Sequence, residues 1–162
     1  MPRWIGAAAE SRCVPVSAGM CGSCTRPTRR TGQSGAGTRA ELHDHLRRQL
    51  DNIVAQGISL SDTAIITITN AEAEAVLRQL RRWRIAAQEL VEYRCADTDS
   101  GVEVGTVYRA KGLDFRAVIH PFVESAPPGT DAERERQDLI LRQQFVAVTR
   151  ARDYVWLGIV RG

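Results

Sequence analysis

The sequence lacks a long apolar run, is almost without lysine, and has no strong excess of apolar or charged residues. A membrane-spanning helix needs about 20 consecutive apolar residues, so we expect no membrane association. Apolar residues make up 43% of the chain and charged residues 25%, which excludes wholesale disorder and a fibrous protein. Residues 4–9 are too short for the apolar part of a secretory signal, and the cytoplasm is therefore the expected compartment.

The charge is distributed unevenly along the chain. Lys111 is the only lysine among 22 basic residues, and the net charge is +3. Residues 1–36 contain five arginines and one acidic residue, which leaves the rest of the chain close to neutral. Most of the arginine abundance reflects a compositional bias of the sequence, so the charge count alone does not indicate nucleic-acid binding.

The composition and the periodicity of the sequence change at Thr38. Residues 1–37 are rich in Pro, Gly, Ser, Thr and Arg and show no period of 2 or 3.6, so they are predicted to form a disordered basic tail. Residues 38–162 are predicted to form one folded domain. Thr38 and Glu41 form a capping-box pattern that starts its first helix.

The predicted elements of the folded part alternate between strands and helices. Alternation of this kind indicates a mostly parallel sheet covered on both faces, a three-layer α/β fold. Ligands of such folds bind at the carboxyl ends of strands. The predicted helices cover residues 39–56, 71–83 and 131–152, and the predicted strands cover residues 64–69, 90–93, 102–107, 117–123 and 154–160.

Two glycine or cysteine patterns near the amino end are incomplete. Cys21 and Cys24 form one C-x-x-C, but Cys13 and Cys95 add no second pair and no H-x₃₋₅-H follows. Free thiols are therefore favoured over a zinc or redox site, and no metal is expected. Residues 32–37 satisfy G-x-x-x-x-G, but the lysine of a phosphate-binding loop is missing, which favours a linker.

Two later segments carry polar groups at places where a parallel sheet exposes them. Residues 104–115 run from a strand through Arg109, Lys111 and Gly112 to Asp114, which suggests weak anion binding. Residues 145–153 place Arg150 near a helix end. This arginine either interacts with the helix dipole in water or stabilises charge on a phosphoryl group.

Residues 105–115 (GTVYRAKGLDF) and 145–152 (FVAVTRAR) closely resemble motifs V and VI of UvrD/Rep-type superfamily 1 DNA helicases, and residues 64–83 resemble motif IV. The resemblance spans about residues 60–160. It implies the second, carboxyl-terminal RecA-like motor domain of an ATP-dependent 3′–5′ DNA helicase. In that family the first motor domain carries most of the ATP and Mg²⁺ site, and the second domain closes over ATP and grips single-stranded DNA.

The resemblance also implies roles for individual residues. Arg150 matches the arginine that reaches the γ-phosphate across the domain interface. Asp114, where the family usually has Glu, and Gly112 match positions at the nucleotide. Two departures are Tyr108, where histidine is frequent, and Ile68, where a phosphate-contacting arginine is common. The positions implied for DNA contact are Thr69, Asn70, Thr106, Arg109 and Lys111.

The other half of a nucleotide site is missing from the sequence. No G-x-x-x-x-G-K-[ST] and no strand ending in paired acids occurs. The chain is therefore expected to need a first motor domain on another polypeptide and not to hydrolyse ATP alone. The alternatives are an inactive remnant of a truncated gene, or a stand-alone nucleic-acid-binding or interaction module. In the nucleic-acid-binding case the phosphate-contacting face would comprise Arg78, Arg81, Arg82 and Arg84.

A positional expectation follows for Arg150. We expect its guanidinium at the carboxyl-end rim of the sheet, near Lys111 and Asp114. We also expect it to be partly exposed and to have no buried ion pair, because its target would lie on another domain.

Overall fold

The computed structural model describes residues 30–36, 38–90, 101–124 and 126–161. Within these ranges the chain forms a six-stranded sheet in the order β1-β6-β5-β2-β4-β3, and every strand pair is parallel. No helix in the described part is long and apolar enough to span a membrane. The elements in chain order are β1 (Arg30–Ala36), α1 (Arg39–Ala55), the short 3₁₀ turn η1 (Leu60–Asp62), β2 (Thr63–Thr67), α2 (Asn70–Arg82), β3 (Ala87–Glu89), β4 (Val102–Thr106), β5 (Phe115–Glu124), α3 (Asp131–Thr149) and β6 (Ala151–Arg161).

Each α-helix in the described part of the chain begins after a threonine that caps its first turn. The Thr38 hydroxyl accepts a hydrogen bond from the Glu41 amide at the start of α1. Thr69 starts α2 and Thr130 starts α3, and each forms a complete capping box with the glutamate three residues later. These side chains satisfy amide groups that would otherwise lack a partner at a helix start. The helix starts expected at Thr38 and Thr69 are thereby confirmed.

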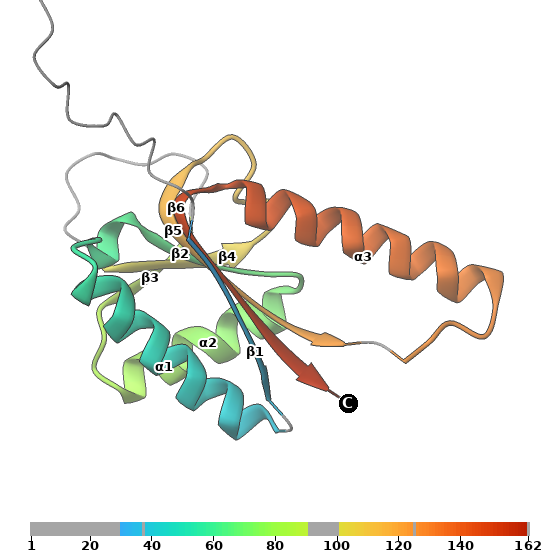
Figure 1. The fold of residues 1–162 in the computed structure, drawn as a ribbon, viewed down its shortest axis with the longest axis horizontal. Coiled ribbons are helices and arrows are strands. Elements are labelled where there is room, and N and C mark those ends of the chain that lie inside the picture. The colour runs from blue at the N-terminus through green and yellow to red at the C-terminus, as the bar shows by residue number, and fades with distance from the viewer. Residues whose placement is uncertain (1–29, 37, 91–100, 125, 162) are drawn as a thin grey trace, which may run out of the picture.

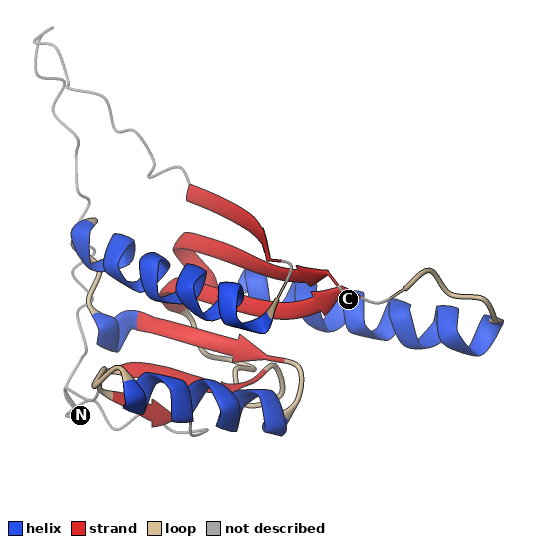
Figure 2. Cartoon of the chain, turned by 90° about the horizontal axis from the view of Figure 1, so that it is seen from below, coloured by secondary structure: helices blue, strands red, loops and turns tan. Residues whose placement is uncertain are grey.

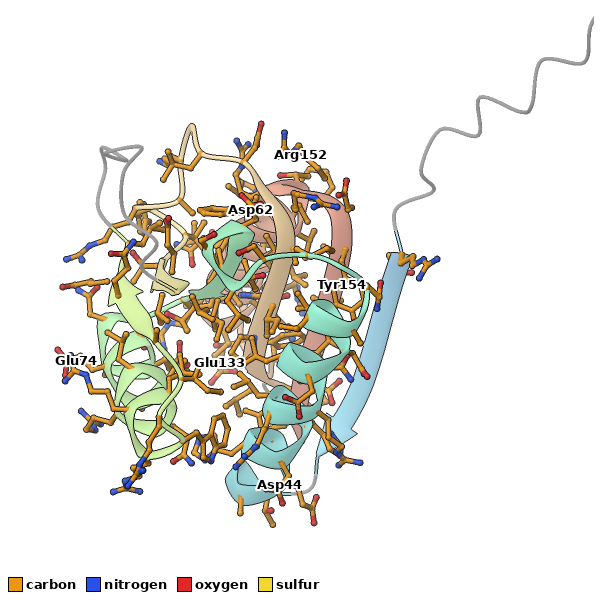
Figure 3. All side chains as sticks on the ribbon, turned by 90° about the vertical axis from the view of Figure 1, so that its left-hand side faces the viewer. Asp44, Asp62, Glu74, Glu133, Arg152 and Tyr154 are labelled. Carbon is orange, nitrogen blue, oxygen red and sulfur yellow. The ribbon has the colours of Figure 1, made fainter. Side chains whose placement is uncertain are left out.

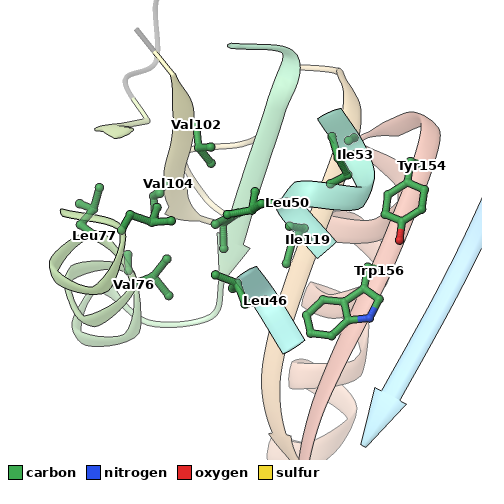
Figure 4. Close-up of a cluster of buried hydrophobic side chains, with 14 of the residues drawn as sticks. Leu46, Leu50, Ile53, Val76, Leu77, Val102, Val104, Ile119, Tyr154 and Trp156 are labelled. Atoms are coloured by element: carbon green, nitrogen blue, oxygen red, sulfur yellow. The ribbon is translucent and has the colours of Figure 1, made fainter. Parts of the chain in front are cut away.

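The helices lie on both faces of the sheet, as Figures 1 and 2 show, which confirms the predicted α/β architecture. One buried cluster joins α1 and α2 to the sheet through residues such as Leu46, Val76 and Trp156 (Figure 4). A second cluster on the opposite face joins α3 to the sheet through Ala147 and Phe115. The strands between these clusters are buried on both faces, as expected for a parallel sheet.

Much of α3 extends past the edge of the sheet (Figure 1). Of its residues only Ala147 is buried. The apolar side chains of Leu139, Leu141 and Phe145 are 53%, 55% and 69% exposed. Leu141 and Phe145 are four residues apart and share one side of α3, and neighbouring exposed apolar side chains often mark a surface that another molecule covers.

Some of the predicted element boundaries are wrong. Residues 30–36, which were assigned to the disordered tail, form β1 and pair with β6. Backbone pairing needs no alternation of apolar side chains, and a Cβ on Gly32 would lie 3.2 Å from Trp156 Cδ1, so glycine allows the close approach. The helix predicted over 131–152 ends at Thr149, and residues 151 and 152 already belong to β6. Of the strand predicted over 90–93, only Leu90 lies within the described residues, and the edge strand β3 ends before it at Glu89. Residues 1–29 and the four cysteines lie outside the described residues.

Candidate functional site

Residues 107–114 connect β4 to β5 and divide the predicted site into two parts. Because β4 and β5 are both parallel to the intervening β2, this connection must return from the carboxyl ends of the strands to their amino ends. Val107 and Ala110 are buried in the cluster beneath α3, so the connection crosses the α3 face of the sheet. We call residues 107–114 the crossover. The crossover therefore starts at the edge of the sheet formed by the carboxyl ends of the strands and ends at the edge formed by their amino ends.

Asp114 and Arg150 lie together where the crossover ends. Phe115 follows Asp114 and Ala151 follows Arg150, and these two following residues are paired at the amino ends of β5 and β6. The Phe115 amide donates to the Arg150 carbonyl over 2.9 Å. Nη1 of Arg150 lies 3.6 Å from Oδ1 of Asp114. The two residues expected to share a nucleotide site are thus adjacent.

The prediction of the strand ends at which this pair lies is wrong. We predicted the carboxyl-end rim, but Asp114 and Arg150 precede their strands and lie at the amino-end edge. Figure 3 shows Arg152 at this edge, at the end opposite the arrowhead of β1. The prediction failed because it assumed that the polar residues stay where β4 ends, whereas the crossover moves Asp114 to the far edge. The proximity of Arg150 to Asp114 was nevertheless predicted correctly.

The environment of Arg150 leaves part of its hydrogen-bonding capacity unused. Its side chain is 28% exposed and that of Asp114 is 61% exposed, so this ion pair is not buried, as expected. Nε of Arg150 is inaccessible to solvent and has no hydrogen-bond partner among the described residues. A guanidinium presents its donors as a planar fork suited to phosphate or carboxylate. Because the Arg150 side chain is partly exposed, the accessible part of this fork can meet a further anion at this edge.

Lys111 and Gly112 lie within the crossover. Nζ of Lys111 is 5.0 Å from the centre of the Tyr108 ring, and Gln143 of α3 donates to the Tyr108 hydroxyl over 3.0 Å. Both Tyr108 and Lys111 are exposed. Gly112 has a φ of +79°, a conformation that favours glycine. The structure therefore gives Gly112 a backbone reason for its identity that is independent of nucleotide binding.

Thr69, Asn70 and Thr106 lie at the opposite edge, where β2 and β4 end. The single proton of the Thr67 hydroxyl is shared between the carbonyls of Thr69 at 3.0 Å and Gly105 at 3.3 Å, and the contact with Gly105 joins the ends of β2 and β4. The Thr69 hydroxyl accepts from the Glu72 amide over 3.3 Å, so it is used for helix capping. Thr106 is buried, and its carbonyl accepts hydrogen bonds from the amides of the first turn of the crossover.

A groove of about 480 Å³ lies between α2 and the ends of β3 and β4. Among the residues predicted to contact DNA, Asn70, Thr106 and Arg109 line it, whereas Thr69 and Lys111 do not belong to its lining. Arg109 forms an ion pair with Glu89, the last residue of β3. We call this the α2 groove, and its lining comprises Asn70, Ala73, Glu74, Leu77, Arg78, Arg81, Glu89, Gly105, Thr106 and Arg109.

The arginine face predicted on α2 is divided by the structure. Arg78 and Arg81 line the α2 groove, and Arg82 and Arg84 do not. Sequence reasoning treated the four as one face and did not single out Glu74 or Glu89. The spacing contained the signal for α2, because Glu74, Arg78 and Arg81 follow Asn70 by 4, 8 and 11 residues, which places them along one side of a helix. Glu89 could not be found in this way, since its partner Arg109 is 20 residues away.

No group of three or more His, Cys, Asp or Glu side chains within the described ranges could hold a metal ion. Gly32 and Gly35 lie in the extended strand β1, so the expected linker over 32–37 is largely a strand. An extended strand does not provide the tight loop at a helix start that cradles a phosphate. The described part thus offers polar groups for a bound phosphate at Arg150 and along the α2 groove.

A solved structure of the C-terminal domain of a possible DNA helicase from Lactobacillus plantarum WCFS1 is similar to this chain. The TM-score is 0.61 and the sequence identity is 26%, over 80% of this chain and 73% of that chain. No protein-family model and no curated protein matches the chain. The comparison supports a helicase-related carboxyl-terminal domain, in agreement with the coarser part of the motif resemblance.

Proposed function

We propose that this chain acts as the second motor domain of an ATP-dependent, UvrD/Rep-type DNA helicase, completing a nucleotide site whose phosphate-binding loop belongs to a first motor domain. In this proposal Arg150 stabilises the charge on the transferring phosphoryl group, and Asp114 and Gly112 lie at the nucleotide. The α2 groove holds single-stranded DNA through Asn70, Thr106 and Arg109. The proposal rests on the motif resemblance together with the similar helicase domain.

One structural observation carries this proposal beyond the resemblance. Arg109, near the start of the crossover, lines the α2 groove, and Asp114, at the end of the crossover, lies beside Arg150. A single eight-residue segment thus connects a cationic groove with an arginine available for an anion. A helicase motor needs such a connection, because ATP turnover must change the affinity of the domain for the nucleic acid.

The residues present fit half of an ATP site. The partly exposed guanidinium of Arg150 presents a fork of donors that suits phosphate oxygens. ATP with Mg²⁺, bound by the partner domain, would supply the phosphoryl group and the metal charge. Arg150 would act as an electrostatic stabiliser only, because it cannot give up its proton to act as a base.

The exposed apolar side chains of α3 support the need for a partner. Leu141 and Phe145 lie on one side of the helix that leads directly into Arg150. A first motor domain that received Arg150 would approach this part of the molecule and could cover those side chains. The free chain is therefore expected to be less soluble than its complex.

The proposal is tested by ATP turnover. The purified chain should hydrolyse no ATP, with or without single-stranded DNA. Addition of a separately expressed first motor domain with G-x-x-x-x-G-K-[ST], such as one encoded beside this gene, should produce DNA-stimulated turnover. Robust hydrolysis by the chain alone, or no change on mixing with a domain that binds it, would overturn the proposal.

A second candidate function is a stand-alone nucleic-acid-binding module. The α2 groove favours it, because the groove is complete within this chain. This function predicts salt-dependent DNA binding with no effect on the ATPase activity of a first motor domain. The two candidates therefore differ in the mixing experiment and agree in the binding experiment.

A further inference from the structure

The α2 groove has a charge pattern that the motif resemblance does not account for. One side of α2 contributes its whole length to the groove, from Asn70 to Arg81. Ala73 and Leu77 are buried in the core, whereas Arg78 and Arg81 are exposed. The apolar residues of this side therefore anchor the helix, and its arginines line the opening.

The opposite side of the α2 groove adds a third guanidinium. Arg109 follows β4, and its side chain is 43% exposed. Arg78, Arg81 and Arg109 thus approach one groove from two separate elements. Arginine forks are suited to phosphate groups, because they donate two parallel hydrogen bonds to one planar or tetrahedral anion.

Two carboxylates hold two of these arginines in the free chain. Nη1 of Arg78 lies 3.8 Å from Oε2 of Glu74, and Arg109 pairs with Glu89. Arg81 forms no ion pair with any described residue. Figure 3 shows Glu74 on the side of α2 that faces away from α1. Both acidic side chains are largely exposed, at 70% and 62%, so each can move to release its arginine.

We propose that Arg78, Arg81 and Arg109 bind successive phosphates of a single nucleic-acid strand in the α2 groove, and that Glu74 and Glu89 are internal counterions which the strand displaces. This inference rests on the proposed function and extends it. It assigns phosphate binding to two further arginines, both on α2, and it makes the acidic residues competitors of the phosphates. The three arginines carry +3 against −2 for the two glutamates, and displacement of the glutamate side chains frees the guanidinium donors for the phosphates.

The proposal predicts effects of opposite sign within one groove. Replacing Arg78 and Arg81 by Gln should weaken binding about tenfold for each hydrogen-bonded charge lost. It should also reduce the slope of log K against log salt concentration by about 1.4, since each phosphate contact on a single strand contributes about 0.7. Replacing Glu74 and Glu89 by Gln should strengthen binding, because the arginines no longer have competing partners.

Matched controls exist on the same molecule. Arg82 is the neighbour of Arg81 on α2 but does not line the groove, and Arg48 lies on α1. The double variant Arg48→Gln/Arg82→Gln removes the same charge as Arg78→Gln/Arg81→Gln. Glu135 and Asp138 are exposed on α3 and serve in the same way for the acidic pair, as Glu135→Gln/Asp138→Asn.

The experiment measures the fluorescence anisotropy of labelled oligo-dT and oligo-U against the full chain at several KCl concentrations, with circular dichroism melts to confirm folding. The expected result is weaker binding only for Arg78→Gln/Arg81→Gln and tighter binding only for Glu74→Gln/Glu89→Gln. If the matched control variants change the affinity as much as the groove variants do, binding arises from diffuse charge attraction. That result would overturn the α2 groove as the binding site, although the chain would still bind a nucleic-acid strand. No binding by the native chain would overturn both. A difference between the two oligonucleotides identifies DNA or RNA as the preferred source of the phosphates.

Discussion

Nη1 of Arg150 lies 3.6 Å from Oδ1 of Asp114, at the edge of the sheet where β5 and β6 begin. The chain brings these residues together from the end of the crossover and the end of α3, 36 positions apart in the sequence. Because the Asp114 carboxylate is mostly exposed, this pair contributes at most about 1 kcal/mol to folding. An arginine that stabilises the fold so little, and whose side chain is partly exposed, is available for an external anion.

Replacement of Arg150 by Ala should separate a role in turnover from a role in stability. With a first motor domain present, we expect the DNA-stimulated ATPase rate to fall by about 10³-fold or more, as when an arginine finger is lost. Arg150→Lys should recover little of it, because an ammonium does not present the planar fork. The melting temperature should change little in both variants.

Arg152→Ala is the matched control for this prediction. Arg152 is exposed, lies two residues further along, and carries the same charge. An equal loss of turnover in Arg152→Ala would indicate a general charge effect at this edge and would remove the specific role of Arg150.

The second prediction concerns the capping role of Thr69. Its hydroxyl accepts from the Glu72 amide, so Thr69→Ala should destabilise the fold by about 1 kcal/mol, and Thr69→Ser should keep most of the stability. Urea unfolding monitored by circular dichroism measures both. If the Thr69 hydroxyl contacts DNA as the motif resemblance implies, Thr69→Ala should also weaken oligo-dT binding under conditions where the variant is fully folded.

The third prediction concerns the close approach of β4 to Leu90. A Cβ on Gly105 would lie 2.6 Å from Leu90 Cβ, and backbone or side chain must move to accept it. Gly105→Ala should therefore cost about 1–3 kcal/mol, which corresponds to a lower melting temperature by several degrees. Gly129→Ala is the control, because its Cβ would meet only Glu133 Oε2 at 3.5 Å. Equal melting temperatures for the two variants would contradict the tight packing at Gly105.

The alternating strands and helices, the helix starts and the proximity of Arg150 to Asp114 could all be predicted from the sequence. Capping boxes and apolar periodicity are local signals, and local signals determine helix starts. The strand β1 and the edge at which Arg150 lies could not be predicted. Pairing of a glycine-containing strand with β6, and the return of the crossover to the amino ends, depend on which strands become neighbours. The sequence pattern does not specify that neighbour relation, since β4 and β5 flank β2 and follow each other in the chain.

The last prediction concerns His120, which is fully buried on β5. Its Nδ1 lies 2.6 Å from the carbonyl of Ile66, which can only accept, so Nδ1 carries the proton. Nε2 is buried and has no hydrogen-bond partner among the described residues. Burial lowers the pKa of His120 below its usual value of 6.5, and the hydrogen bond to the Ile66 carbonyl and the charge of Glu72 offset this only in part.

A pKa lowered by folding makes the native state prefer the neutral imidazole. The unfolded chain binds the proton first as the pH falls through 6.5, so the free energy of unfolding should be constant above about pH 7 and decrease below 6.5. The decrease should continue until the pH reaches the lowered pKa of the folded chain. Urea unfolding between pH 5.5 and 7.5 measures this slope. His120→Asn should abolish most of it while keeping a donor for Ile66, and His43→Gln should leave it in place. A slope that persists unchanged in His120→Asn would show that another group causes the pH dependence.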